Sequence, residues 1–428
     1  MYIKKNVKIK NGYSYTAIYN FNSKETYLVN KDVGSKLLSK QIESLHTETI
    51  ETLINLGILT TEITQSECEP EVFEYSLFDD CNRYKRYDTV YFEATNRCNF
   101  NCIHCYADMG REGNEFLTLP MMEKYLAHMS DVSKCNIRFT GGEPFLNPHI
   151  RKILKYTSEH ILPVQRHSIV TNGSGRLEDI LYALELGYEV QISIYGMNGN
   201  TFSKIARVSE TLYEKVKNNL LALSKTEYAG QIVCLFSINT ITFDEMELFV
   251  NYISTLGFRV ILNRPASIGR ANDNWDILSL SLEKHMDFSR YNYQLANGFN
   301  RYCYHACKLT WAYVDVYGNV KPCAFIRDGF TFGNLAEQTM KEIRETVEFQ
   351  RFRSINADDF EKCSECELEY CCTGGCCGET LVHDGNIKGT YTWCNIKPYE
   401  NKYFINLKDE KIIKVQKYAG GTFDFFDT

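Results

Sequence analysis

Three closely spaced cysteines are the residues best suited to chemistry. Cys98, Cys102 and Cys105 form a CxxxCxxC loop. A four-iron cluster needs four ligands, so three thiolates leave one iron open to a substrate or a cofactor. Zinc is the alternative, but zinc sites combine one cysteine pair with a second, matching pair, and no such pair lies near this loop. The spacing therefore favours an iron–sulfur cluster with one open coordination position.

The elements that must position this loop are predicted from residue 87 onward, where strand-like runs alternate with segments of helical spacing. We expect strands at 89–93, 136–139, 167–170, 189–194, 231–239 and 258–263, with helices such as 118–129 and 211–223 between them. This order predicts the α/β class, with a parallel sheet curled into a partial (β/α)6 TIM-like barrel. Such barrels carry their chemistry in the loops after the strands, and the cysteine loop follows the first one.

Glycines and polar residues follow the later strands. A Gly-Gly-Glu-Pro segment comes after the second strand, and its glycines would let the backbone approach a ligand closely. A carboxylate or carbonyl there can accept a hydrogen bond from an ammonium group. Single residues could equally be a turn asparagine, a solvated arginine or a core tyrosine, but their order along the barrel favours a site. The candidates are Gly141, Gly142, Glu143, Asn172, Ser193, Arg207 and Tyr106.

With these segments in order, the chain resembles the radical S-adenosylmethionine (SAM) superfamily, whose signature is this cysteine loop after the first barrel strand. The resemblance implies that SAM chelates the open iron and that Gly141, Gly142 and Glu143 hold its amino group. It places Ser193 and Arg207 at the ribose and the carboxylate. It also implies that a reduced cluster cleaves SAM to methionine and a 5′-deoxyadenosyl radical, which abstracts hydrogen from the substrate. Segment 266–270 resembles a family segment at the barrel edge.

A second set of cysteines has the spacing C-x10-G-x4-C, then C-x2-C-x5-C-x3-C, then one more cysteine. This resembles the SPASM domain, which binds two auxiliary 4Fe-4S clusters, so the resemblance implies three clusters in all. The first auxiliary cluster would take Cys303, Cys307, Cys323 and Cys376, and the second Cys363, Cys366, Cys372 and Cys394. Cys303 departs from the family spacing, so an open iron in the first auxiliary cluster is an alternative. Zinc knuckles, with a colourless protein, are another.

The first sixty residues predict a small winged-helix-like module. Short strands are expected at 7–10, 15–20 and 26–29, followed by two helices, the second ended by Gly57. The order of elements resembles the PqqD-like peptide-recognition element of enzymes that mature ribosomally made peptides. Such a module can add a disordered leader peptide as an extra strand at a sheet edge. A winged helix for DNA is the alternative, which the net charge of −7 disfavours.

The domain organisation predicted from these patterns has five parts. They are a recognition module (1–62), a linker (63–86), the barrel (87–285), an auxiliary-cluster domain (286–400) and a charged tail (401–428). Seventeen cysteines, an odd number, without a signal peptide favour thiolate ligation in a reducing compartment over disulfides. We therefore expect a cytoplasmic protein with no membrane span and no nucleic-acid partner.

The function expected from the resemblance is a peptide maturase. It would abstract hydrogen from a precursor peptide with a leader sequence and install a thioether or carbon–carbon crosslink, using an external one-electron reductant such as flavodoxin or ferredoxin. One alternative is a formylglycine-forming dehydrogenase of the anaerobic sulfatase-maturing type. Those relatives carry an acidic residue after the cysteine matched by Cys323, where this chain has Ala324. The other alternative is a non-catalytic cluster or DNA-binding protein. The sequence does not identify a general base.

Overall fold

A computed structural model describes most of the chain and divides it into two compact units. The described residues are 1–62 without 21 and 24, 89–130, 134–295, 311–355 without 328, 359–360, 362–372, 376–389, 407, 409–418 and 422–428. One unit joins the amino terminus to residues 286–305 and 355–428. The other comprises residues 83–285 and 306–354.

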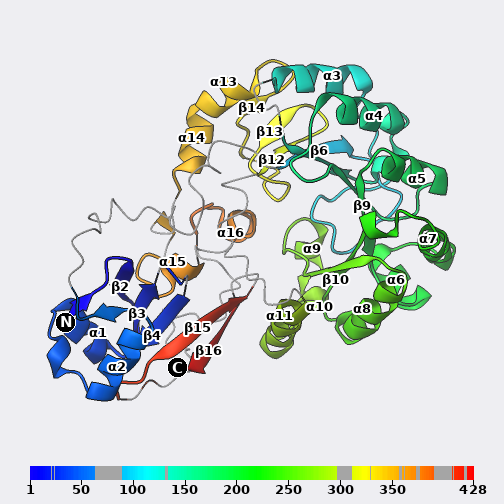
Figure 1. The fold of residues 1–428 in the computed structure, drawn as a ribbon. Coiled ribbons are helices and arrows are strands. Elements are labelled where there is room, and N and C mark those ends of the chain that lie inside the picture. The colour runs from blue at the N-terminus through cyan, green and yellow to red at the C-terminus, as the bar shows by residue number, and fades with distance from the viewer. Residues whose placement is uncertain are drawn as a thin grey trace. The chain divides into compact units, whose positions relative to one another are not determined.

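The second unit is built on six parallel strands that neighbour one another in chain order (Figure 1). They are β6 (Thr89–Thr95), β7 (Asn136–Gly141), β8 (Ser168–Thr171), β9 (Glu189–Ile194), β10 (Ile232–Ser237) and β11 (Arg259–Asn263). Helices lie outside the strands: α3 (Leu119–His128), α4 (Ile150–His160), α5 (Leu177–Glu185), α6 (Gly199–Ala206), α7 (Glu210–Leu223) and α8 (Met246–Thr255). The predicted partial barrel is confirmed.

The strand interiors explain why this sheet forms. Apolar residues recur at every second position, so they lie on one face of each strand. Val90 and Phe92 of β6 and Ile137 and Phe139 of β7 are all buried. Two short helices follow β11, α9 (Arg270–Asp273) and α10 (Trp275–Leu278), and then the longer α11 (Leu282–Leu295).

The barrel sheet continues beyond β6 into the cysteine-rich part of the sequence, which the sequence analysis did not predict. Strand β12 (Trp311–Val314) pairs in parallel with β6, and β13 (Asn319–Lys321) and β14 (Gly333–Asn334) follow antiparallel. Helices α13 (Met340–Glu345) and α14 (Val347–Arg353) come next. Thr339 and Glu342 form a capping box at the start of α13.

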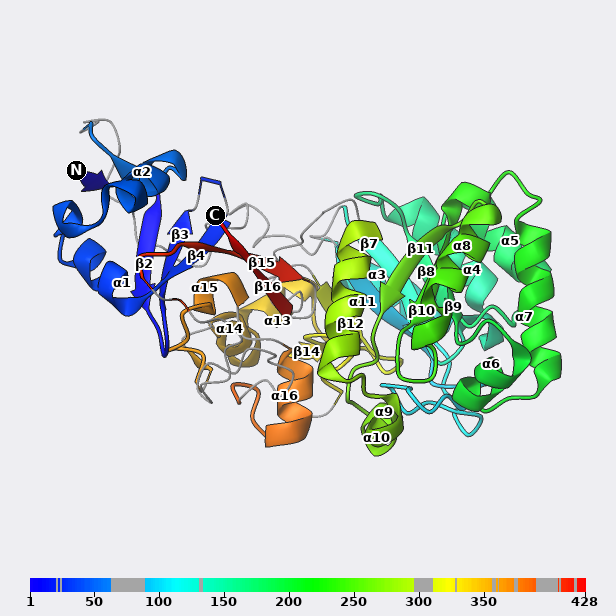
Figure 2. The same cartoon turned by 90° about the horizontal axis from the view of Figure 1, so that it is seen from below.

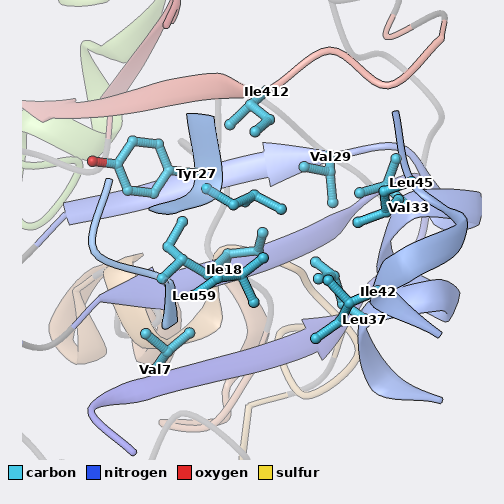
Figure 3. Close-up of a cluster of buried hydrophobic side chains, with 12 residues drawn as sticks. Val7, Ile18, Tyr27, Val29, Val33, Leu37, Ile42, Leu45, Leu59 and Ile412 are labelled. Carbon is cyan, nitrogen blue, oxygen red and sulfur yellow. The ribbon is translucent and has the colours of Figure 1, made fainter. Parts of the chain in front are cut away.

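The amino-terminal module of the first unit has the predicted order of strands, then helices. Its elements are β1 (Tyr2–Ile3), β2 (Val7–Asn11), β3 (Thr16–Asn20), β4 (Glu25–Val29), α1 (Lys31–Leu38), η1 (Ile42–Ser44), α2 (Thr47–Asn55) and β5 (Leu59–Thr60). Gly57 follows α2 with a positive φ of 68°, as expected for a residue that ends a helix. Val33 and Leu37 of α1 pack on Ile18 and Val29 of the sheet (Figure 3).

The other face of that sheet packs against the cysteine-rich segment. Tyr19 and Leu28 contact a cluster that includes Cys366 and Leu368. Two short helices follow in this region, α15 (Glu369–Cys372) and α16 (Cys377–Asp384). The sheet is therefore buried on both faces, between helices and the cysteine-rich segment.

The end of the chain, predicted only as a charged tail, forms two strands in its described part. They are β15 (Ile413–Tyr418) and β16 (Thr422–Asp427), and β15 pairs with β4, so the sheet order is β16-β15-β4-β3-β2 (Figure 2). The predicted linker 63–86 lies outside the described residues. The predicted domain bounds remain predictions. No helix among the described residues is long and apolar enough to span a bilayer.

Candidate functional site: the cysteine loop and its surroundings

The cysteine loop leaves β6 and is held by backbone hydrogen bonds to α6. The Asn101 N–H donates to Ala206 O (3.0 Å), and the Ile103 N–H donates to Ile205 O (2.9 Å). Ile103 also packs in a small apolar cluster with Ile205 and Ala271. These contacts fix the loop before any ligand binds, which is what a preorganised site needs.

The loop's thiols are poorly solvated. Burial, and next the nearby Glu143 carboxylate, raise the pKa of Cys98 to about 12. Burial also raises the pKa of Cys102 well above its usual range, and the neighbouring Cys105 and Cys98 raise it further. Such thiols lose their protons readily only to a cationic centre.

The donor set therefore fits an iron–sulfur cluster. The Nδ1 atom of His104, inside the loop, is buried and has no hydrogen-bond partner among the described residues. Among the residues that the structure describes, no three His, Cys, Asp or Glu side chains lie close enough together to hold a single metal ion.

The Gly-Gly-Glu segment lies directly against the start of the cysteine loop. The Gly142 N–H donates to Thr95 O and the Glu143 N–H donates to Arg97 O, both at 2.8 Å. A Cβ at Gly142 would come within 2.0 Å of Arg97 O and 3.0 Å of the Cys98 N. Only glycine allows this approach.

The Glu143 side chain joins the second and third strands and does not extend freely towards a ligand. Its two oxygens accept from Phe145 N (3.1 Å), Thr171 Oγ1 (2.7 Å) and Asn172 N (2.7 Å). Burial raises the pKa of Glu143 to about 7, and these hydrogen bonds oppose the rise. Glu143 is thus a positioning residue for the loop that carries Asn172.

Replacing Glu143 with glutamine should weaken SAM binding. Both carboxylate oxygens accept from donors, so the amide NH2 must face one of them, and the Asn172 loop has to shift. We expect a dissociation constant raised about 10-fold or more, since an unpaired buried donor costs roughly 1–3 kcal/mol. Calorimetry on the reconstituted protein measures it. Glu185→Gln, at an exposed position of α5, is the control, and equal affinities for the two variants would contradict the prediction.

Asn172 is part of a closed ring of hydrogen bonds that the sequence analysis did not predict. Asn172 Nδ2 donates to Asn99 Oδ1 (2.9 Å), Asn99 Nδ2 donates to Ser174 Oγ (2.8 Å), and Ser174 Oγ donates to Asn172 Oδ1 (2.7 Å). Asn99 belongs to the cysteine loop, so the ring ties that loop to the end of β8. The sequence signal for this ring is the polar residue Asn99, which lies between two of the expected cluster cysteines.

Arg207 lies beside the cysteine loop with an exposed side chain. It directly follows Ala206, whose carbonyl holds the loop, and it has a left-handed backbone with φ 50° and ψ 50°. Non-glycine residues adopt this conformation only at a cost, so its presence at a functional position is notable. Within the described residues its guanidinium forms no hydrogen bond or ion pair, which leaves it available to an anion.

Ser193 and Tyr195 lie at the end of β9, near the same loop. Burial raises the pKa of Tyr195 well above its usual range. The Tyr195 ring lies 4.9 Å from the His104 ring and 6.1 Å from the Phe100 ring, both in the cysteine loop. These rings pack an apolar wall against the loop.

Arg270, in the segment with the weakest sequence match, binds the cysteine loop at three points. Its guanidinium donates to Cys102 O (2.9 Å), Met109 O (2.7 Å) and the Asp108 carboxylate. A Cβ at the preceding Gly269 would meet Tyr106 O at 2.6 Å. The segment after β11 therefore holds the cysteine loop in place.

Arg270→Lys should reduce iron retention. A lysine cannot reproduce a planar fork that reaches three acceptors. Outer contacts of this kind typically change metal affinity about 10-fold or more. Iron content and the visible spectrum after gel filtration measure the loss. Arg166→Lys, at an exposed position before β8, is the control, and full iron content in Arg270→Lys would contradict the prediction.

Tyr106 packs against the SPASM segment. Its ring meets the Phe325 ring edge-on at 5.0 Å. Nearby, the buried Glu93 carboxylate accepts from Tyr313 Oη and pairs with Arg327 at 3.3 Å. This polar cluster could not be predicted from the sequence, because its members meet only in the folded sheet.

The auxiliary cysteines are only partly within the described residues. Cys303, Cys307 and Cys394 lie outside them, and only the backbone of Cys372, in α15, is described. Cys323 follows β13 in the barrel unit, whereas Cys363, Cys366 and Cys376 belong to the other unit. Their pairing into clusters remains a prediction. Cys234, which lies outside both predicted ligand sets, is fully buried in β10.

Comparisons with known proteins agree with this geometry. Residues 92–253 match the radical SAM superfamily model, and residues 303–367 match the SPASM iron-sulfur cluster-binding domain. The subtilosin biosynthesis protein AlbA of Bacillus subtilis is 22% identical over 301 residues, 67% of this chain and 65% of AlbA. The mycofactocin maturase MftC of Mycolicibacterium smegmatis is 22% identical over 311 residues, 67% of this chain and 76% of MftC.

One solved structure shares the fold over nearly the whole chain. Streptococcus suis SuiB bound to its precursor peptide SuiA aligns with a TM-score of 0.56 at 14% identity, covering 92% of this chain and 99% of SuiB. The match to AlbA spans slightly less than two thirds of AlbA's length, at 65%.

The chain thus carries a radical SAM domain. More narrowly, this domain is followed by a SPASM iron–sulfur cluster-binding domain, and the cofactors that such domains bind are SAM and iron–sulfur clusters.

Proposed function

We propose that the protein is a radical SAM peptide maturase that removes hydrogen from a ribosomally made precursor peptide and installs a thioether or carbon–carbon crosslink. The observation that carries the proposal is the first compact unit, in which an amino-terminal strand-and-helix module is packed on the SPASM cysteine segment. AlbA is named as a bacteriocin (subtilosin) biosynthesis protein and MftC as a mycofactocin maturase, and SuiB is solved with a precursor peptide, which supports the same assignment.

The proposed SAM site uses residues of the second unit. When bound, the cluster and SAM supply a hydrogen-abstracting radical. Cys98, Cys102 and Cys105 would hold the cluster. The lack of a Cβ at Gly141 and Gly142 lets this segment lie against Thr95 and Arg97, at the start of the cysteine loop. Asn172 is bonded to the loop through Asn99, Ser193 lies at the end of β9, and the Arg207 guanidinium suits the SAM carboxylate because it can bind bidentately.

Water exclusion is the other task of this site. Phe100, Tyr195 and Phe202 form a packed aromatic group beside the loop, with ring centroids 5.8–6.1 Å apart. Such a wall limits solvent around a reactive species.

We also propose three 4Fe-4S clusters, two of them auxiliary, and a flavodoxin- or ferredoxin-like reductant in the cytoplasm. Joining two residues removes two hydrogen atoms from the peptide. One is taken by the cleaved SAM, and the other leaves as a proton and an electron. The auxiliary cysteines would supply the centre that accepts this electron.

The test combines the anaerobically reconstituted protein with SAM, a reductant and the short peptides encoded beside its gene. We expect 5′-deoxyadenosine and a peptide whose tandem mass spectrum shows two residues joined. Cys102→Ala should form neither. Absence of 5′-deoxyadenosine would refute the proposal, and a single altered residue reactive towards hydrazine would indicate formylglycine formation instead.

A further inference from the structure

The carboxy-terminal hairpin occupies one edge of the amino-terminal sheet. Strand β15 pairs antiparallel with β4 over three residue pairs, Ile413 with Leu28, Lys414 with Tyr27 and Val415 with Thr26. The same strand pairs with β16 over six residues. Without β15, the β4 edge would present unpaired backbone groups, which readily take up an added strand.

An apolar side chain anchors the hairpin in the module's own core. Ile412, directly before β15, is 6% exposed and belongs to the cluster formed by the sheet and α1, where it lies over Tyr27 and Val29 (Figure 3). Every other member of that cluster comes from residues 1–62. A residue from the far end of the chain thus completes the core of this module.

An acidic side chain two residues earlier is the second anchor. Glu410 accepts from the His46 backbone N–H (2.7 Å) and from Lys36 Nζ (3.1 Å), and Asn30 Nδ2 donates to Asp409 O. His46 is the residue before α2, so the carboxylate also meets the positive end of that helix. These contacts recognise an acidic residue, one spacer and a branched apolar residue, followed by a strand.

Resting on the proposed function, we propose that the β4 edge is where the precursor peptide adds its strand and that the carboxy-terminal hairpin is an internal occupant which the peptide displaces. The peptide that fits carries an acidic residue two positions before a branched apolar residue, as Glu410 and Ile412 do. Because β15 makes twice as many pairs with β16 as with β4, the hairpin can leave the edge with its own pairing intact.

Displacement would also reach the cysteine-rich segment. Ile413 and Val415 pack with Leu407, Leu368 and Cys366 on the other face of the sheet. An incoming strand that replaces β15 would also replace these contacts. Peptide binding would therefore alter the packing around the segment that carries auxiliary cysteines.

Hydrogen exchange on the unaltered, reconstituted protein tests the displacement. In the free protein the amides of β15 and β4 should both be protected. With saturating precursor peptide, those amides of residues 413–415 that face β4 should lose protection, and those that face β16 should keep it. The β4 amides should stay protected, because the peptide takes over their pairing. Protection of β15 that is unchanged by bound peptide would overturn the proposal, and would point to the β2 or β16 edge instead.

Affinity measurements give an independent readout. Ile412→Asp should weaken hairpin docking and tighten precursor binding about 10-fold, because the apparent affinity rises with the fraction of open edge. Phe426 of β16, in the same hairpin, is 50% exposed, so Phe426→Asp should leave the affinity unchanged. Equal affinities for the two variants would contradict the proposal.

A synthetic peptide of residues 409–418 separates this inference from the proposed function. Offered to the full-length Ile412→Asp variant, whose own hairpin is loosened, it should bind, and its Glu410→Lys and Ile412→Asp versions should not. Peptide binding does not depend on SAM cleavage, so the binding result would stand even if no 5′-deoxyadenosine formed. If instead the reaction proceeds but the peptide does not bind, the displaced-hairpin proposal fails alone.

Discussion

Gly142→Ala is expected to stop SAM cleavage in a chain that stays folded. The added Cβ would lie 2.0 Å from Arg97 O, far inside any real contact, so the Gly-Gly-Glu segment and the cysteine loop must move apart. A displacement of about 1 Å at a reacting centre can cost roughly 100-fold in rate. The measurement is 5′-deoxyadenosine formed per minute with excess reductant, together with iron content.

The matched control is Gly230→Ala, where an added Cβ meets nothing within 4 Å. Neither glycine has a positive φ, so both substitutions are permitted by the backbone and differ only in steric contact. Cleavage within twofold of the unaltered protein in Gly142→Ala would show that the segment is not held against the loop.

Glu367→Ala is expected to loosen the first unit. The Glu367 side chain is fully buried and accepts from three consecutive backbone N–H groups of the β2–β3 turn, at Tyr13 (3.1 Å), Ser14 (3.2 Å) and Tyr15 (3.0 Å). It lies next to Cys366. Removing this shared acceptor should cost about 3 kcal/mol, taking roughly 1 kcal/mol for each donor. Hydrogen exchange in β2 and β3, and iron content, measure the change.

The control for this prediction is Glu365→Gln, two residues earlier and exposed. It keeps the buried carboxylate and should leave both exchange and iron content as they are. If Glu367→Ala retained full protection of β2 and β3, the carboxylate would not be what joins the turn to the cysteine segment.

The barrel could be predicted from sequence because its strands carry buried apolar residues at alternate positions and are followed by recognisable loops. Residues such as Val90, Phe92 and Ile137 fix the strands locally, and the cysteine spacing marks the first loop. The amino-terminal module could also be predicted, since the turn at Asn11-Gly12 and the helix end at Gly57 are local sequence signals.

What the sequence did not yield depends on partners distant along the chain. β12 has only four residues, and its pairing with β6 spans more than 200 positions. The carboxy-terminal hairpin was interpreted as a charged tail, although Gly420-Gly421 between alternating polar and apolar residues is a hairpin signal. The contacts of Arg270 with the cysteine loop could not be predicted from the sequence, because they form only when the barrel closes.

The edge-on contact between Tyr106 and Phe325 has a consequence for electron flow. Tyr106 directly follows Cys105, and Phe325 is two residues beyond Cys323, so both rings border cysteines expected to ligate different clusters. Both also belong to one compact unit, held by the hydrogen-bonded sheet β6-β12-β13. A packed aromatic route from the neighbourhood of Cys105 to that of Cys323 therefore lies within a single compact unit, which would suit electron transfer between groups bound near these two cysteines.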